Sequence, residues 1–328
     1  MMTGIPCFAG CAVCWAMIRR RPAMETLEGL SEALETTGDI RSIVRTMKSL
    51  SAVSIRQYEQ AEAALAGFEQ TIELGLTALL RDRRGRGKPL PETVTGKGGE
   101  ALIVIGSDRG LCGRYNENVA RFGAERFGPQ TVTLAVIGAR AAARLEAEGR
   151  PADRHFAPPG SVAGLTATVQ AVILETDRWI REHGVGRVRL VHNRRAGRVN
   201  AELSERHLLP IPESTLARLV DADWPGPGRP FFRMPEAQLM SWLVRQRLFV
   251  MIYRALAEAL ASEHATRLAA MQRAERNIEE RQADLNSAYR RKRQETITRE
   301  LLDVVAGFEA VGTPEPDNEA GQNGTAGT

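Results

Sequence analysis

The chain has 328 residues, of which 43% are hydrophobic and 26% charged, and its formal net charge is +4. A chain of this length can bury one sizeable core and still have residues left for extended elements, so it need not be a single globule. Its aromatic content of 5% is low for a protein that is all core, and its mildly basic charge favours an acidic partner surface without requiring nucleic acid.

An unusual leader occupies residues 1–23. Its Cys7, Cys11 and Cys14 have the spacing of iron–sulfur ligands in radical S-adenosylmethionine enzymes. We favour the interpretation that the leader lies upstream of the natural start. Its uncharged run precedes the arginines, the reverse of a secretory signal, and is short for a membrane span. We expect Cys112, the remaining cysteine, to be a free thiol in a reducing compartment.

Residues 24–88 contain no proline and carry apolar side chains mostly three and four positions apart. This narrow stripe predicts a coiled-coil helix rather than a globular one. In its middle, Ser49, Ser51 and Ser54 stand where a zipper would have leucine. They predict either close helix approach or a weakly adhesive outer surface. The segment 81–99 is basic and rich in glycine and proline, which predicts a surface linker.

An α/β domain is predicted for residues 89–230. Buried-strand patterns alternate with helical ones, which indicates a mostly parallel, Rossmann-like sheet covered on both faces. Strands are predicted at 101–105, 132–137, 187–192 and 199–203. One helix is predicted to begin near Asn116, a second to follow the strand at 132–137 and end at Gly149, and a third to span 162–183. A loop is predicted at 151–160.

The turn after the first predicted strand raises the possibility of a nucleotide-dependent enzyme. Gly106, Gly110 and Gly113 are spaced four and three apart, so they do not form G-x-G-x-x-G, and the sequence has no P-loop. We interpret them as a tight strand-to-helix turn, with Asp108 accepting hydrogen bonds from free backbone N–H groups. The histidines lack metal-ligand spacing, so we predict no catalytic residue and no metal site.

The stretch 236–309 has no proline and no glycine before Gly307. As one helix it would be ~110 Å long, too long for a compact domain, so we expect it to form an antiparallel coil with the first helix. Glu263 and Arg267 would support it as an i,i+4 pair. The basic turn at 290–299 fits nucleic acid, a solvated face or an acidic protein surface, and we favour the last.

Three motifs resemble the gamma subunit family of F-type ATP synthases. The sequence Ser-Asp-Arg-Gly-Leu-Cys-Gly at 107–113 matches the family's strand-and-loop signature residue for residue. The segment 43–52 is similar to its N-terminal helix motif. The segments 263–271 and 293–301 are similar to its C-terminal helix signature. The resemblance covers residues 24–308.

The resemblance implies that the terminal helices form an asymmetric coiled coil on the axis of a ring of three alpha and three beta subunits. The α/β domain would lie below, on the membrane c-ring and the epsilon subunit. Rotation of this shaft would couple ion flow to ATP synthesis or hydrolysis in beta. The chain would be non-catalytic and would bind no cofactor itself, since its partners bind ATP, ADP and Mg²⁺. It would be peripheral, at the cytoplasmic face of the bacterial inner membrane.

The same resemblance implies two groups of subunit contacts. The polar contact between shaft and beta would involve Met47, Arg293, Gln294, Thr298 and Glu300. The turn near the acidic lower lobe of beta would contribute Ser107, Asp108, Arg109, Gly110, Leu111, Cys112 and Gly113.

Departures from the family pattern occur at Arg114, where a glycine is common, and at Ser49, Ser51 and Val53. They indicate a divergent branch, such as the synthases that are thought to move sodium ions. The alternative function is a non-catalytic coiled-coil scaffold, which would leave the 107–113 match unexplained. The predicted domains are a leader at 1–23, a coiled-coil helix at 24–88, the α/β domain at 89–230, a second coiled-coil helix at 236–309 and a disordered tail at 310–328.

Overall fold

The computed structural model describes residues 26–91, 98–196, 200–225 and 231–311. They fall into two compact units, one built from the two ends of the chain, up to residue 43 and from residue 276, and the other from residues 44–275. Two long helices, α2 (Leu27–Ala63) and α8 (Glu236–Val311), contribute to both units. The predicted leader, and the predicted tail beyond residue 311, lie outside the described residues.

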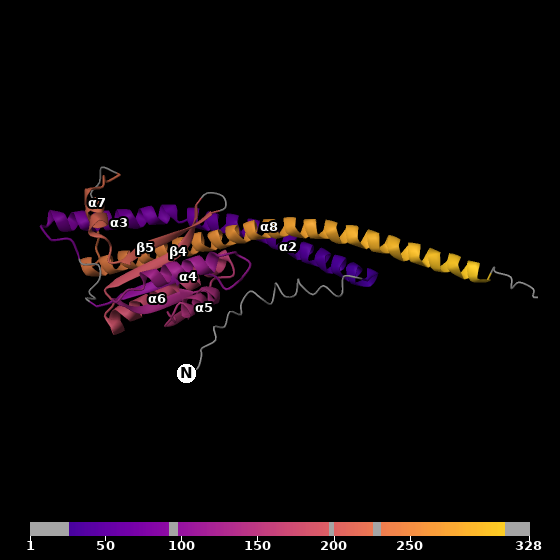
Figure 1. The fold of residues 1–328 in the computed structure, drawn as a ribbon. Helices are drawn as coiled ribbons and strands as arrows, with labels where there is room; N and C mark the ends of the chain where they lie inside the picture. The colour runs from indigo at the N-terminus through magenta and orange to yellow at the C-terminus, as the bar shows by residue number, and fades with distance from the viewer. Residues whose placement is uncertain (1–25, 92–97, 197–199, 226–230, 312–328) are drawn as a thin grey trace, which may run out of the picture. The chain divides into compact units, whose positions relative to one another are not determined.

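The larger unit contains a five-stranded sheet with the order β3-β2-β1-β4-β5 (Figure 1). Strand β1 pairs in parallel with β2 and β4, β2 pairs in parallel with β3, and β4 pairs antiparallel with β5. The predicted α/β class and the mostly parallel sheet are therefore confirmed. The strands are β1 (Glu100–Ile105), β2 (Thr131–Ile137), β3 (Arg154–Phe156), β4 (Arg187–Ala196) and β5 (Asn200–Leu209).

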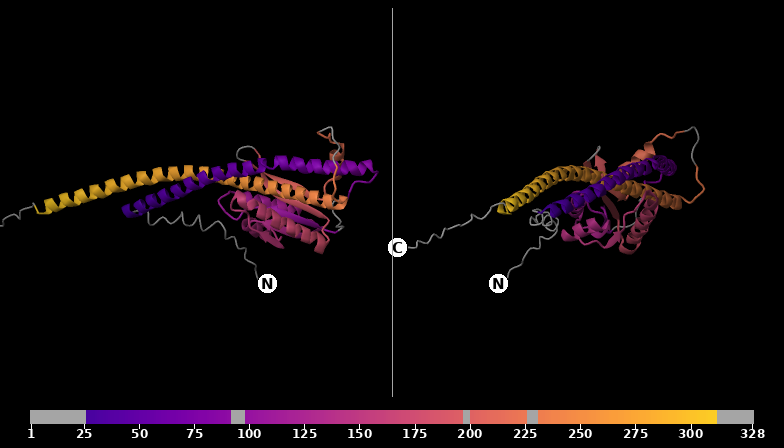
Figure 2. Two further views of the ribbon diagram at one scale, coloured as in Figure 1. Left: turned by 180° about the vertical axis from the view of Figure 1, so that it is seen from behind. Right: turned by 90° about the vertical axis from the view of Figure 1, so that its right-hand side faces the viewer.

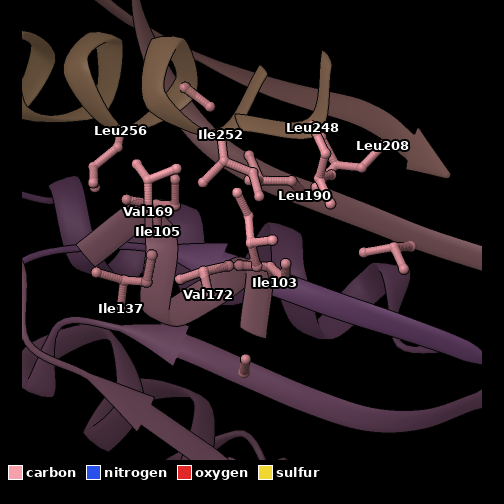
Figure 3. Close-up of a cluster of buried hydrophobic side chains, with 14 of the residues drawn as sticks. Ile103, Ile105, Ile137, Val169, Val172, Leu190, Leu208, Leu248, Ile252 and Leu256 are labelled. Carbon is pink, nitrogen blue, oxygen red and sulfur yellow. The ribbon is translucent and has the colours of Figure 1, made fainter. Parts of the chain in front are cut away.

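Helices cover both faces of this sheet because side chains alternate along its central strand. Leu102 and Val104 of β1 pack with α4 (Tyr115–Arg126) and α5 (Ala139–Ala147). Ile103 and Ile105 point the other way, toward α6 (Leu165–His183) and the first half of α8 (Figure 3). Burying each such leucine or isoleucine stabilises the fold by about 1.5–3 kcal/mol. The core of the α/β domain thus includes the first half of α8.

The first predicted helix is divided in the structure. After α2, the chain makes a tightened turn in which the Leu65 N–H donates to the Glu62 carbonyl, and α3 (Ala66–Gly85) follows. The prediction of a linker from Arg81 was wrong in its start, because Arg81 lies in α3 and its guanidinium donates to the Val220 carbonyl at 3.2 Å. Part of that linker, residues 92–97, lies outside the described residues.

Two short elements were not predicted. Strand β3 lies inside the predicted loop at 151–160, and helix α7 (Glu213–Asp221) follows the sheet. Three residues are too few to show an alternating pattern. Helix α7 owes its place to packing, since Leu216 and Leu219 join Leu76 and Leu79 of α3 in a second apolar cluster at the beginning of α8. Predicted α6 is confirmed and ends at His183, with Gly184 in the left-handed C-cap conformation.

In the smaller unit, α2 and α8 run antiparallel side by side (Figure 2). The Arg41 guanidinium pairs with Glu279 and donates to the Gln282 side chain at 3.3 Å, and Gly38 also faces Gln282. In this register the start of α2 lies opposite the turn of α8 near residue 293. Beyond it, α8 has no partner helix among the described residues.

Candidate partner-contact sites

Two features shape the 106–113 turn. A glycine allows close contact with α5, and side-chain hydrogen bonds hold the backbone of the turn in place. A Cβ on Gly106 would lie 2.2 Å from that of Ala141, so glycine is required for this contact. The Asn116 side chain accepts from the Ser107 N–H at 3.0 Å and donates to the Ser107 Oγ at 2.9 Å. Asn116 was not singled out from sequence. Its position at the start of α4, three residues beyond the matched motif, was the available signal.

Asp108 caps a helix that does not follow it in the chain. Helix α5 begins after Gly138, which has no side chain to accept a hydrogen bond, and the Ala139 N–H donates to the Asp108 carboxylate at 2.6 Å. The predicted hydrogen bond from a free N–H to Asp108 is confirmed, but the N–H belongs to α5 rather than to the turn. A carboxylate there also complements the positive end of the α5 dipole.

Asp108→Ala should lower the free energy of unfolding of the full chain by about 1 kcal/mol, the usual cost of losing an N-cap. Chemical denaturation measures this loss. Asp221→Ala is the matched control, because Asp221 pairs with Arg84 where both side chains are exposed, and it should change stability little. Equal losses in the two variants would contradict the capping role.

Helix α8 covers the carboxyl end of the sheet. In an open α/β sheet, ligands usually bind where the strand order reverses, which here is between β1 and β4. In this chain the Tyr115 hydroxyl donates to the Ala259 carbonyl of α8 at 2.8 Å, and Arg267 of α8 donates to the Gly110 carbonyl at 3.3 Å. The crevice that would hold a nucleotide is thus occupied by the protein's own helix.

A polar cavity of about 150 Å³ remains beside this contact, lined by Tyr58, Arg109, Glu263, His264 and Arg267 among others. The predicted pair of Glu263 and Arg267 is present at 2.5 Å, and both side chains are buried. Burial raises the pKa of Glu263, although the Arg267 guanidinium opposes this effect. Burial also lowers the pKa of His264 to about 4, so this ring is neutral at pH 7.

The thiol of the 106–113 turn is buried and held in its protonated form. Cys112 is a buried free thiol, as predicted, and burial raises its pKa, so it stays protonated and weakly nucleophilic. Its sulfur contacts the Ser107 Oγ at 3.9 Å and the Arg109 carbonyl at 3.6 Å. What this arrangement can do is hold the turn in one conformation.

That conformation presents Leu111 to solvent. Leu111 has a φ of 62°, which is strained for a leucine, and its side chain is 61% exposed. Asp108, Arg109 and Gly113 of the same turn are exposed as well, whereas Ser107 and Cys112 are buried. The turn therefore has an exposed face and a set of buried side chains that fix its conformation.

Met47 lies on α2 in the larger unit and is partly buried. On either side of it, Arg45 and Lys48 pair with Glu275 of α8 at 3.2 and 2.5 Å. Leu50 and Val53 are more than half exposed on the same helix, while Ser51 is buried. Ser51 is thus buried, as close helix approach requires, and a weakly adhesive outer surface beside it stays a prediction.

The predicted contact residues on α8 belong to the smaller unit, whereas Met47 and the 106–113 turn belong to the larger one. Arg293, Gln294, Thr298 and Glu300 are all exposed, and the Thr298 hydroxyl donates to the Gln294 carbonyl at 2.9 Å. Large apolar side chains beyond them are exposed too: Ile297, Leu301, Leu302, Val304, Val305 and Phe308. Sequence reasoning did not single out this apolar end.

Within the described ranges, no cluster of three histidine, cysteine or acidic side chains is arranged to hold a metal ion. In the same part of the chain, no helix combines the length and the apolar character that a membrane crossing requires.

Comparisons with known proteins agree on one family. A family model described as "ATP synthase" matches residues 26–311. The ATP synthase gamma chain of Granulibacter bethesdensis is 30% identical over 305 residues, covering 88% of this chain and all of that protein. That of Geotalea uraniireducens is 27% identical, covering 88% and 99%. In fold, the chain is similar to one in a Euglena gracilis mitochondrial ATP synthase structure of OSCP, F1 and c-ring, with a TM-score of 0.62, 19% identity and coverage of 90% and 98%.

Proposed function

The chain belongs to the gamma-chain family of ATP synthases, and from this premise we propose that it is the central rotor shaft of such an enzyme. A gamma chain is a non-catalytic subunit of the complex. Here the shaft would turn inside a ring of three alpha and three beta subunits and couple ion flow to ATP synthesis or hydrolysis. The observation that supports this role best is the end of α8, which carries exposed apolar side chains where α2 no longer pairs with it.

The mechanism we propose is a coupling between shaft angle and nucleotide affinity. Each orientation of an asymmetric coil would present a different set of side chains to each beta subunit. Any difference in contact free energy then biases beta among its conformations, and nucleotide binding biases the angle in return. On the side of the shaft that changes partners, polar and small surface residues suit this mechanism, because a deep apolar contact there would hold a single angle.

We assign two contact regions to this mechanism. On the shaft, Arg293, Gln294, Thr298 and Glu300 would meet the beta subunits, with Met47 contributing from α2. Near the sheet, the exposed face of the 106–113 turn would meet an acidic part of beta. Strained, exposed Leu111 supports this assignment, since backbone strain concentrates at functional contacts.

The α/β domain would rest on the c-ring and the epsilon subunit, which places the protein peripherally at the cytoplasmic face of a bacterial inner membrane. ATP, ADP and Mg²⁺ would be bound by the partner subunits. Whether the enzyme moves protons or sodium ions is a property of the membrane ring in this scheme.

Arg293→Ala with Gln294→Ala should slow ATP-driven rotation about tenfold while leaving assembly intact, because hydrogen bonds to charged groups are among the stronger ones lost. Single-molecule rotation of the reconstituted complex measures the rate. Arg276→Ala, which removes an exposed arginine of α8 outside the predicted contact, is the control and should rotate at the normal rate. A double variant with unchanged coupling would remove these two residues from the contact.

The proposed function as a whole is tested by co-purification with alpha and beta subunits. We expect one copy of this chain for every three alpha–beta pairs. A chain that instead purifies as a stable homodimer, without alpha and beta, would support the alternative of a coiled-coil scaffold.

A further inference from the structure

On the face of α8 that packs against the core of the α/β domain, a large apolar side chain recurs every four residues. Leu248, Ile252, Leu256 and Leu260 are all buried in the same cluster, and the first three lie in a row along the helix in Figure 3. A slide of α8 by four residues, slightly more than one turn and about 6 Å, would replace each of them by the next. Because apolar contacts are non-directional, this face by itself does not distinguish the two positions.

The charged residue Glu258 lies within the interface between α8 and the sheet, and side chains of the sheet bind it. Glu258 of α8 accepts a hydrogen bond from the His192 Nε2 of β4 at 2.6 Å. The Arg206 guanidinium of β5 donates to both of its carboxylate oxygens, at 2.6 and 2.8 Å. His192 is completely buried and Glu258 is only 13% exposed. Glu258 therefore joins α8 to two strands at once.

The protonation states of this group follow from its contacts. Burial by itself raises the pKa of Glu258, but the hydrogen bonds from His192 and Arg206 outweigh it and hold the pKa below its usual value. An ionised carboxylate only accepts, so the His192 Nε2 carries the proton. The His192 Nδ1 has no partner among the described residues, and burial lowers the pKa of the ring, which stays neutral. A second acid, Glu62 of α2, lies beside this group; burial and the charge of Glu258 raise its pKa, and Arg254 of α8 lies 3.9 Å from it.

We propose that Glu258, held by His192 and Arg206, fixes the register of the shaft helix on the α/β domain. A four-residue slide would bring either Arg254 or Ser262 to the place of Glu258. Arg254 would then face the like charge of Arg206, and Ser262 is too short and uncharged to accept both donors. Buried ion pairs often add little net stability, and selecting one register is their best-attested role.

Helix α8 makes other ion pairs, but their side chains are more exposed than those of His192 and Glu258: Arg245 pairs with Asp177 of α6 at 2.6 Å, and Arg254 pairs with Glu69 of α3 at 2.7 Å. Exposed pairs contribute little free energy, so they select a register less strongly. Tyr115 donates to a backbone carbonyl of α8, and such a carbonyl recurs at every turn. Arg267 reaches the 106–113 turn rather than a strand. The importance of the register rests on the proposed function, because torque that enters through the α/β domain would have to pass to α8 without slippage.

The test replaces the whole group by apolar residues and measures position and stability together. In full-length chains whose native cysteines are replaced by serine, spin labels are attached at Leu174→Cys on α6 and Gln272→Cys on α8, both exposed in the larger unit. Leu174 lies beside Phe249, so the labels are separated by about 35 Å, mostly along the α8 axis. The test variant is His192→Leu, Arg206→Met, Glu258→Leu.

The matched control is Arg154→Met with Glu175→Leu, which removes an ion pair between β3 and α6 that does not touch α8. Pulsed electron spin resonance should give one distance in the parent and the control. The test variant should keep its melting temperature but show a second distance shifted by about 6 Å. A single unchanged distance would overturn the proposal. Loss of folding would overturn it as well, because the group would then be needed for stability rather than for register.

A second variant moves the carboxylate by one turn. Glu258→Ala with Ser262→Glu should make the shifted distance the main one, and persistence of the parent distance would count against the proposal. These measurements need no partner subunit. Failure to assemble with alpha and beta would contradict the proposed function, whereas an unchanged distance would contradict only the register role.

Discussion

Arg267→Met is expected to lower the free energy of unfolding by about 3–5 kcal/mol, because it leaves the Glu263 carboxylate buried without its cation. Both side chains are less than a tenth exposed in the structure. Urea denaturation of the full chain measures the loss. The matched control is the double variant Glu263→Leu with Arg267→Met, which removes both charges and should recover most of the stability. A double variant as unstable as the single one would show that the ion pair is not the cause.

The pH dependence of the single variant provides an independent check. Burial already raises the pKa of Glu263 in the folded protein, and losing Arg267 raises it further. The folded state then binds more protons than the unfolded state above the normal carboxyl pKa, so stability falls as pH rises. The free energy of unfolding of Arg267→Met should therefore differ less from that of the parent at pH 5 than at pH 8. The opposite trend would contradict this assignment.

Gly138→Ala is expected to lower the free energy of unfolding by about 3–4 kcal/mol, because it adds both backbone strain and an overpacked contact. Gly138 has a φ of 107°, and a Cβ on it would lie 2.6 Å from the Ser107 N and 2.9 Å from the Gly106 carbonyl carbon. These are backbone atoms, so the 106–113 turn itself would have to move. Thermal and chemical denaturation measure the loss.

Movement of the turn has its own readout. In a chain whose leader cysteines are replaced by serine, Cys112 should react faster with a thiol reagent in Gly138→Ala than in the parent, because the turn no longer covers it. Gly149→Ala is the control, since Gly149 also has a positive φ of 74° but open space around it. It should lose about 1–2 kcal/mol without exposing Cys112. Equal effects at the two glycines would rule out the steric contact.

The extended elements of this chain were the easiest to predict from sequence. A proline-free stretch with apolar residues three and four apart is a helix in nearly any context, and α8 was predicted to within two residues at its end. Strands β1 and β2 were found because both lie deep in the sheet and read as continuous apolar runs. Local patterns suffice where an element is long or buried on both faces.

Short elements and the interior of the candidate site depended on contacts that a linear pattern does not contain. Strand β3 and helix α7 are defined by neighbours brought from elsewhere in the chain. The cap that Asp108 provides to α5 lies 31 positions away from the helix end it serves. Likewise, Glu263 and Arg267 read as a surface pair in the sequence but are buried, because α8 covers the end of the sheet.

The sequence by itself determined the helical character of both ends of the chain, the α/β class and the motif at 107–113, since each is encoded in residues close together along the chain. Only the tertiary structure decided that α8 fills the crevice where a sheet of this kind would bind a ligand, and that His192, Arg206 and Glu258 meet there. The reason is physical: hydrophobic patterning specifies which face is buried, but not which residues meet on that face. That choice is made by directional contacts between segments far apart in the chain.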